Sequence, residues 1–204
     1  MSFAYHAGSR NLQDRFDTRR LADRLGERFL SSAAIDADDR AFIKRMDMFF
    51  LATADASGRP QCSYKGGDPG FVRVLDDRTV MYPEYRGNGV MASLGNIEEN
   101  PHVGLLMIDF AEDLIGLHVN GSARVVEDAV LRGERPDLPV DPVPGRRAQL
   151  WVVVEVEEAY IHCRKHIPRL VPAERARSWG TDAARPKGGD FFGVKADRVR
   201  KADG

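Results

Sequence analysis

The segment 87–97 combines flexible glycines with small polar side chains at the start of a short predicted helix, among them Asn88, Ser93 and Asn96. The first amides of a helix have no acceptor within it, and the helix dipole makes that end positive. A phosphate or another anion binds well in such a place. Asn and Ser also cap helices, and capping is compatible with anion binding.

A second polar group lies in the segment Ser63-Tyr64-Lys65, just before Gly66 and Gly67. Side chains two residues apart on a strand point to the same side, so Ser63 and Lys65 share a face. A hydroxyl and an ammonium group there suit a phosphate, although both residue types are also common on exposed strands.

The histidines invite a metal hypothesis, because His162 and His166 are four residues apart and flank Cys163. No third ligand accompanies them, and they follow a strand, where helical spacing does not apply. We therefore predict no metal site and assign no catalytic residue. Arg164 or Lys165 could approach a bound cofactor, and His118 fits a hydrogen-bonded histidine of the barrel.

Hydrophobic periodicity predicts the elements that position these groups. Helices are expected over 12–30, where Asn11 and Asp14 suit a cap, and after the acidic cap at Asp36. The segment 48–54 is apolar on both faces, which indicates a fully buried strand. The further strands expected are 61–65, 71–75, 79–82, 103–110, 114–126 and 150–156.

The first four strands follow one another in about 35 residues, as in a meander. Residues 132–148 are rich in proline and are expected to form a long loop, while 167–179 could hold a short helix. This order predicts an α+β barrel. We divide the single structural domain into an N-terminal helical extension (1–35), a barrel (36–165) and a C-terminal helix and tail (166–204).

The charge and composition of the chain argue against some classes of binding partner. The chain has 204 residues, a formal net charge of −1 and a pI near 6.5, so no strong field attracts nucleic acid or an anionic membrane. No apolar run has the length of a membrane helix, and the N-terminus does not resemble a signal peptide. The two cysteines, Cys62 and Cys163, lack metal-type spacing, which fits a reducing, cytoplasmic location.

Several segments together resemble the pyridoxamine 5'-phosphate oxidase-like FMN-binding family. They are 50–54 (FLATA), 58–61 (GRPQ), 63–67 (SYKGG), 69–74 (PGFVRV), 82–88 (YPEYRGN) and 93–97 (SLGNI). The resemblance runs from about Phe42 to Arg124, with a weaker similarity at 160–163.

The resemblance implies a split β-barrel homodimer that holds FMN near the subunit interface, with Tyr82 or Tyr85 against the flavin ring. The cofactor-binding residues that it implies are Ser63, Tyr64, Lys65, Tyr82, Asn88, Ser93, Leu94 and Asn96. The family's namesake oxidase has arginine-rich and Arg-Lys segments where this chain has 63–65 and 87–89. This difference argues against the namesake reaction, although it leaves the phosphate site in place.

The resulting functional hypothesis is an FMN-dependent oxidoreductase that transfers hydride to or from an unknown small-molecule substrate. The first alternative is a flavin carrier or sensor without turnover. A further alternative is a related barrel that binds heme or a deazaflavin, for which His118 and His162 are the candidate axial ligands of the heme.

Overall fold

The computed structural model describes residues 5–29, 34–85, 87, 89–162, 164–171 and 173. Within them, seven strands form one antiparallel sheet in the order β2-β1-β5-β6-β7-β4-β3. The strands are β1 (Met48–Ala54), β2 (Pro60–Gly66), β3 (Arg73–Val74), β4 (Thr79–Tyr85), β5 (His102–Ile108), β6 (Gly116–Glu127) and β7 (Ala148–His162). The helices are α1 (Ala7–Arg15), α2 (Arg19–Phe29), α3 (Ala37–Arg45), α4 (Ala92–Glu99) and α5 (Asp128–Glu134), with a 3₁₀ turn η1 (Pro144–Arg146).

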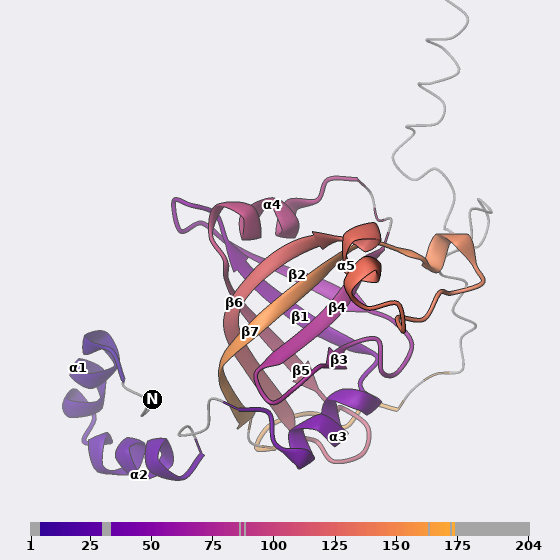
Figure 1. The fold of residues 1–204 in the computed structure, drawn as a ribbon. Coiled ribbons are helices and arrows are strands. Elements are labelled where there is room, and N and C mark those ends of the chain that lie inside the picture. Colours follow the sequence, from indigo (N-terminus) through magenta and orange to yellow (C-terminus); the bar gives the residue numbers. More distant parts are fainter. Residues whose placement is uncertain are drawn as a thin grey trace, which may run out of the picture.

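The two longest strands, β6 and β7, pair in the middle of the sheet from Gly116↔His162 to Glu127↔Leu150. Their register shifts between Asn120 and Gly121, which is a β-bulge. A bulge increases the local twist and bends the strand. The sheet coils into a barrel, with α4 across one end and α3 near the other (Figure 1). The α+β split-barrel prediction is confirmed.

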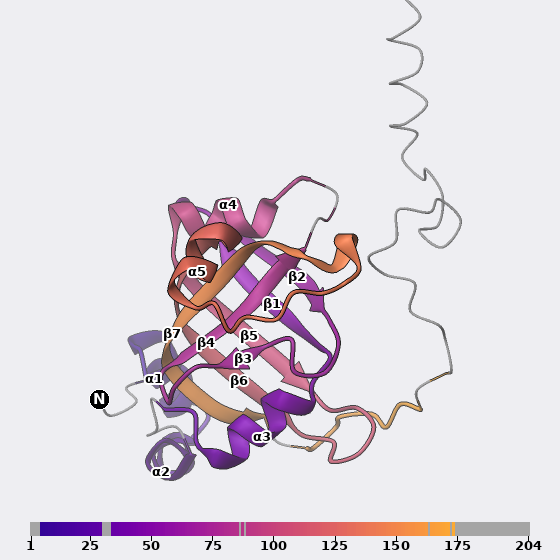
Figure 2. The ribbon, with the colours of Figure 1, turned by 45° about the vertical axis from the view of Figure 1, so that its right-hand side comes forward.

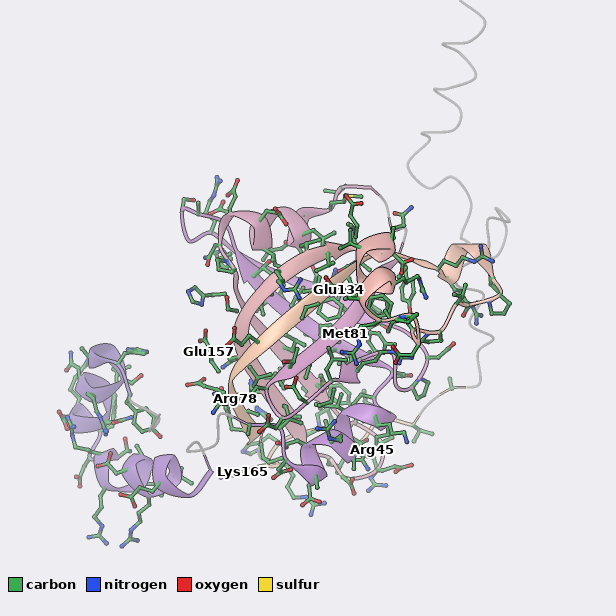
Figure 3. The ribbon with its side chains drawn as sticks, in the orientation of Figure 1. Arg45, Arg78, Met81, Glu134, Glu157 and Lys165 are labelled. Atoms are coloured by element: carbon green, nitrogen blue, oxygen red, sulfur yellow. The ribbon has the colours of Figure 1, made fainter. Side chains whose placement is uncertain are left out.

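Successive side chains of a strand point to opposite faces of the sheet, and the buried ones form two separate apolar clusters. The larger cluster fills the barrel and includes Phe49, Tyr82 and Val119, each fully buried. The smaller one includes Met81, Leu131 and Trp151 and lies outside the barrel under α5, near the labelled Met81 in Figure 3. Because Met81 and Tyr82 point to opposite faces of β4, this strand is buried on both sides.

The N-terminal helices differ from the prediction. One helix was expected over 12–30, but the chain forms α1 and α2, and Asp17 between them has a positive φ of 52°. The cap of α1 is His6, whose ring accepts a hydrogen bond from the amide of Ser9. By contrast, Asp36 caps α3 in a reciprocal capping box with Asp39, as the acidic first turn indicated.

The meander prediction is wrong in its pairing. β1 and β2 form a hairpin, and β3 pairs with β4, but β2 and β3 stand at opposite edges of the sheet. The segment between them therefore crosses from one half of the barrel to the other. Figure 2, turned by 45°, shows β2 and β4 meeting below α4.

Three smaller expectations also change. The proline-rich stretch 132–148 contains the end of α5 and the turn η1. β1 is buried on one face only, because Ala52 is exposed and Phe50 partly so. The described residues of 167–179, which are 167–171 and 173, hold no helix.

Replacing Gly121 with alanine should disrupt the central ladder. A Cβ atom there would lie 2.0 Å from the carbonyl oxygen of Glu155, which is backbone and has no room to move. We expect the free energy of unfolding to fall by about 3 kcal/mol or more. Urea unfolding of both proteins measures this difference.

The matched control is Gly133→Ala in α5, where a Cβ atom meets nothing within 4 Å. This variant should gain about 0.5–1 kcal/mol, because alanine favours the helix. Equal stability of the Gly121→Ala variant and the unaltered protein would contradict the close approach of the Glu155 carbonyl to Gly121.

Candidate functional site

The main candidate site is a cavity of about 450 Å³ at the seam of the barrel, where the two halves of the sheet approach each other. We call it the seam cavity. Residues of β2, the end of β4, the start of α4 and the start of β7 line it. The sheet order separates β2 from β4 by four strands, so only the coiling of the sheet brings them together.

The start of α4 opens onto the seam cavity. Its N-cap, Met91, has a left-handed backbone (φ 53°, ψ 29°) and makes no capping hydrogen bond through its side chain. Met91, Ala92, Ser93 and Leu94 all line the cavity. Within the described residues the N-cap side chain therefore leaves the first amides of α4 uncapped, and the positive end of the helix dipole faces the cavity.

Two serine hydroxyls lie beside this helix end. The Oγ atoms of Ser63 on β2 and Ser93 on α4 are 2.8 Å apart, and both residues line the cavity. Ser93 is 6% exposed. The two hydroxyls form a hydrogen bond with each other in which either can be the donor, and each can instead rotate to donate to a ligand beside the start of α4.

Lys65 lies on the same face of β2 as Ser63, as the two-residue period predicted. It does not present an unpaired charge, because its ammonium group forms an ion pair with Glu84 on β4. Both side chains are about 15% exposed. This ion pair links the two edges of the seam and leaves the charged groups among the described lining residues balanced.

The two tyrosines have different places. Tyr82 is fully buried in the barrel core with its ring edge-on to Phe49, and it does not line the seam cavity. Burial, and then the charge of Glu84, raises the pKa of the Tyr82 hydroxyl. Among the described residues this hydroxyl has no hydrogen-bond partner. Tyr85, three residues on, lines the cavity, and burial raises its pKa to about 12.

The asparagines differ as well. Asn96 lies on α4, but its amide donates to Thr53 Oγ1 (3.0 Å) and Gln61 Oε1 (3.3 Å), and it does not line the cavity. Asn88 lies outside the described residues. Of the predicted binding residues, the structure brings together Ser63, Tyr64, Lys65, Ser93 and Leu94.

Three polar lining residues were missed from the sequence: Gln61, Glu84 and Gln149. Gln61 could have been found, since it is two residues before Ser63 on the same strand face. Glu84 and Gln149 carry no local signal, because they reach the cavity only through the pairing of β4 with β7.

The glycine pair after Lys65 shapes the cavity wall. A Cβ atom on Gly67 would lie 2.5 Å from Cγ of Phe71, and one on Gly66 would lie 2.4 Å from the hydroxyl of Tyr64. The absence of side chains at these positions lets the Phe71 ring pack against the backbone. Phe71 thereby forms part of the apolar wall.

The histidine candidates form a separate cluster on β6 and β7. His118 Nε2 and His162 Nδ1 are 3.0 Å apart, and the Tyr160 ring stacks on His118 at 4.6 Å. Neither histidine lines the seam cavity. Burial, and then the charge of His162, lowers the pKa of His118.

The described part of the chain has neither a metal-binding cluster nor a membrane-spanning helix. It holds no group of three or more His, Cys, Asp or Glu residues placed to bind a metal ion. Nor does it include a helix with the length and apolar character needed to span a membrane.

The family relationship is seen in a comparison with family models. The model described as "Pyridoxamine 5'-phosphate oxidase" matches residues 35–163, which include every strand and the seam cavity. The chain belongs to the pyridoxamine 5'-phosphate oxidase family. The family resemblance seen in the sequence is therefore confirmed. No curated protein matches the chain significantly.

The solved structures similar to this chain carry different descriptions. A pyridoxamine 5'-phosphate oxidase-like protein from Lactobacillus delbrueckii is 22% identical, with 63% of this chain and 95% of that one covered and a TM-score of 0.46. HupZ from Group A Streptococcus is 24% identical (61% and 91% covered, TM-score 0.46). HutZ from Vibrio cholerae, described as a heme storage protein, is 18% identical (63% and 94% covered, TM-score 0.40).

The lowered pKa of His118 predicts a pH-dependent stability. Below the ordinary histidine pKa of 6.5 the unfolded chain takes up a proton at this residue, while the folded chain resists it. The contribution of His118 to stability is thus full above that pH and is lost as the pH falls through the lowered pKa. Thermal unfolding between about pH 5 and 8 should show this decline.

His118→Gln removes the titrating group and should flatten the dependence in this range. If the variant and the unaltered protein lose stability in parallel as the pH falls, His118 is not the cause.

Proposed function

We propose that the chain binds FMN in the seam cavity and uses it as an oxidoreductase acting on a small-molecule substrate. The observation that carries the proposal is the side-chain-uncapped start of α4, which faces the cavity beside the Ser63–Ser93 pair. A helix N-terminus with adjacent hydroxyl donors is a suitable site for a phosphate group.

The donor set fits a flavin mononucleotide. The first amides of α4, Ser63 and Ser93 would hold the phosphate, and Gln61 and Gln149 offer amide groups to the ribityl hydroxyls or the polar edge of the ring. Phe71 and Tyr85 supply apolar and aromatic surface. A volume of about 450 Å³ lies within the usual range for cofactor sites, about 300–1,000 Å³.

Lys65 has a smaller role in this arrangement than its charge suggests. Glu84 compensates the positive charge of the Lys65 ammonium group, so this ion pair would join the two edges of the seam. The phosphate would then be bound by neutral donors and the helix dipole. The lysine and glutamate also contribute polar atoms to the wall of the seam cavity.

The bound flavin would supply the hydride chemistry, and the protein would orient it and limit access of water. No described residue is assigned as an acid or base, because a flavin can exchange hydride without one. Tyr85 would remain protonated at neutral pH, since its pKa is raised to about 12, and would therefore be a hydrogen-bond donor.

We also propose that two copies form a homodimer with the cofactor near their interface. Tyr64 is 61% exposed and lies next to Ser63 and Lys65 on β2, with its ring edge-on to Phe50. An exposed aromatic ring on the strand that lines the cavity, packed against a partly exposed one on β1, is a suitable surface for a partner subunit. Sedimentation analysis with and without FMN tests this part.

Replacing both serines should weaken FMN binding through its phosphate. The Ser63→Ala/Ser93→Ala variant loses the two hydroxyl donors, and its FMN affinity should fall about tenfold or more. Riboflavin lacks the phosphate, so its affinity should change little. Titration of the apoprotein, followed by quenching of flavin fluorescence, measures both affinities.

Ser122→Ala is the matched control, because Ser122 lies on β6 and does not line the seam cavity. Absence of FMN binding to the unaltered protein would contradict the proposal. Equal losses of FMN and riboflavin affinity in the double variant would place the phosphate elsewhere. A Soret band in the purified protein would favour the heme alternative.

Turnover separates the enzyme from the carrier or sensor. We expect the FMN-loaded protein to oxidise NADH or NADPH when an electron acceptor is present, which the loss of absorbance at 340 nm would record. If neither nicotinamide reduces the bound flavin, the non-catalytic alternative is favoured for these donors.

A further inference from the structure

A second cavity, of about 350 Å³, lies next to the seam cavity and shares Phe71, Pro83 and Tyr85 with it. The turn after Gly67, the strands β3 and β4, and the loop between α5 and β7 enclose it. We call it the arginine cavity, because Arg73, Arg132, Arg146 and Arg147 line it.

The charges of the arginine cavity are not balanced. Its only described carboxylates are Asp68 and Asp141. Asp68 pairs with Arg146 at 3.6 Å, and the Asp141 side chain accepts a hydrogen bond from the Val143 amide.

Arg132 is also engaged. It pairs with Asp128 and donates to the carbonyl oxygens of Leu138 and Pro139. Through these two carbonyl contacts, Arg132 holds the loop that follows α5 against the helix.

The two remaining arginines form no ion pair within the described residues. Arg147 donates from Nε to the Asp141 carbonyl oxygen at 3.1 Å, and Arg73 extends from β3. Arg73 lines the cavity together with Tyr85, whose pKa is raised by burial. Two arginines in a concave site without carboxylate partners favour an anionic ligand.

The remaining walls are apolar. Pro83, Pro139, Val140 and Pro142 line the cavity with the ring of Trp151, which is 3% exposed. A site that combines a few cations with apolar walls suits an organic molecule better than a bare inorganic ion.

We propose that the arginine cavity binds a small organic anion, with its carboxylate or phosphate group on Arg73 and Arg147 and its apolar body against the proline and aromatic walls. The cavity adjoins the seam cavity at Tyr85, so the ligand would lie beside the proposed flavin site. The inference does not depend on FMN, and its test uses protein without flavin.

The test follows the fluorescence of Trp151, which lines the cavity. The full chain has two tryptophans, and Trp179→Phe removes the other signal. Benzoate and phenyl phosphate serve as the anionic probes, and benzamide is their neutral counterpart. We expect saturable changes with at least one anion, and an affinity at least about tenfold weaker for benzamide.

Arg73→Gln with Arg147→Gln should weaken binding of the anion by about tenfold or more, whereas Arg73→Lys with Arg147→Lys should retain part of it. Arg124→Gln, on the exposed face of β6, is the control and should not change the affinity. Circular dichroism of each variant shows that the fold is kept.

The Ser63→Ala/Ser93→Ala variant separates the two cavities, because it should bind the anion as the unaltered protein does. No saturable binding of either anion would overturn the proposal. So would equal binding of benzamide, unchanged affinity in the double glutamine variant, or a loss of anion affinity confined to the serine variant.

Discussion

The pairing of β6 with β7 is the interaction on which the rest of the structure depends. These strands join the half of the sheet formed by β2, β1 and β5 to the half formed by β4 and β3. The register shift at Asn120/Gly121 leaves Glu157 of β7 without a partner, and such a bulge bends the strand and increases its twist. Beside it, the Glu155 carbonyl approaches Gly121 so closely that a side chain at position 121 would not fit. The larger core cluster then stabilises the curvature, because Phe49 from one half packs against Tyr82 from the other, with ring centroids 4.9 Å apart.

The seam where the halves meet is also where the polar chemistry is found. The edges of β2 and β4 do not pair with each other along the sheet, so side chains replace the missing ladder. Lys65 and Glu84 form an ion pair across the seam, and Ser63 contacts Ser93. These side-chain contacts close the barrel and leave space for the seam cavity. A continuous backbone ladder between β2 and β4 would leave no such space. The stability of the seam and its capacity to bind a ligand therefore rest on the same few residues.

Local sequence predicted the faces of the strands better than their partners. Along β6, Leu117, Val119 and Ala123 lie in the core with the spacing of alternate residues, and this pattern can be read from the sequence because a period of two depends only on the strand itself. The same rule placed Ser63 and Lys65 together. It could not show that β2 and β3 lie at opposite edges or that Glu84 would pair with Lys65, since both depend on strand pairings far apart in the chain. Tyr82 illustrates the same limit: its type suggested a cavity wall, whereas its place in β4 directs it into the core.

The two cavities show how one fold can combine different electrostatic environments. In the seam cavity the Lys65 charge is compensated by Glu84, and an anion would depend on helix amides and hydroxyls. In the arginine cavity the cations exceed the carboxylates, so charge itself provides the attraction. The boundary between them consists of Phe71, Pro83 and Tyr85, none of which carries a charge at neutral pH. The loop that supplies Arg147 joins α5 to β7, and side chains exposed on it can change without altering the central ladder. In a barrel of this kind, the strands and α4 determine the shape of the seam cavity, whereas one loop supplies much of the wall of the arginine cavity.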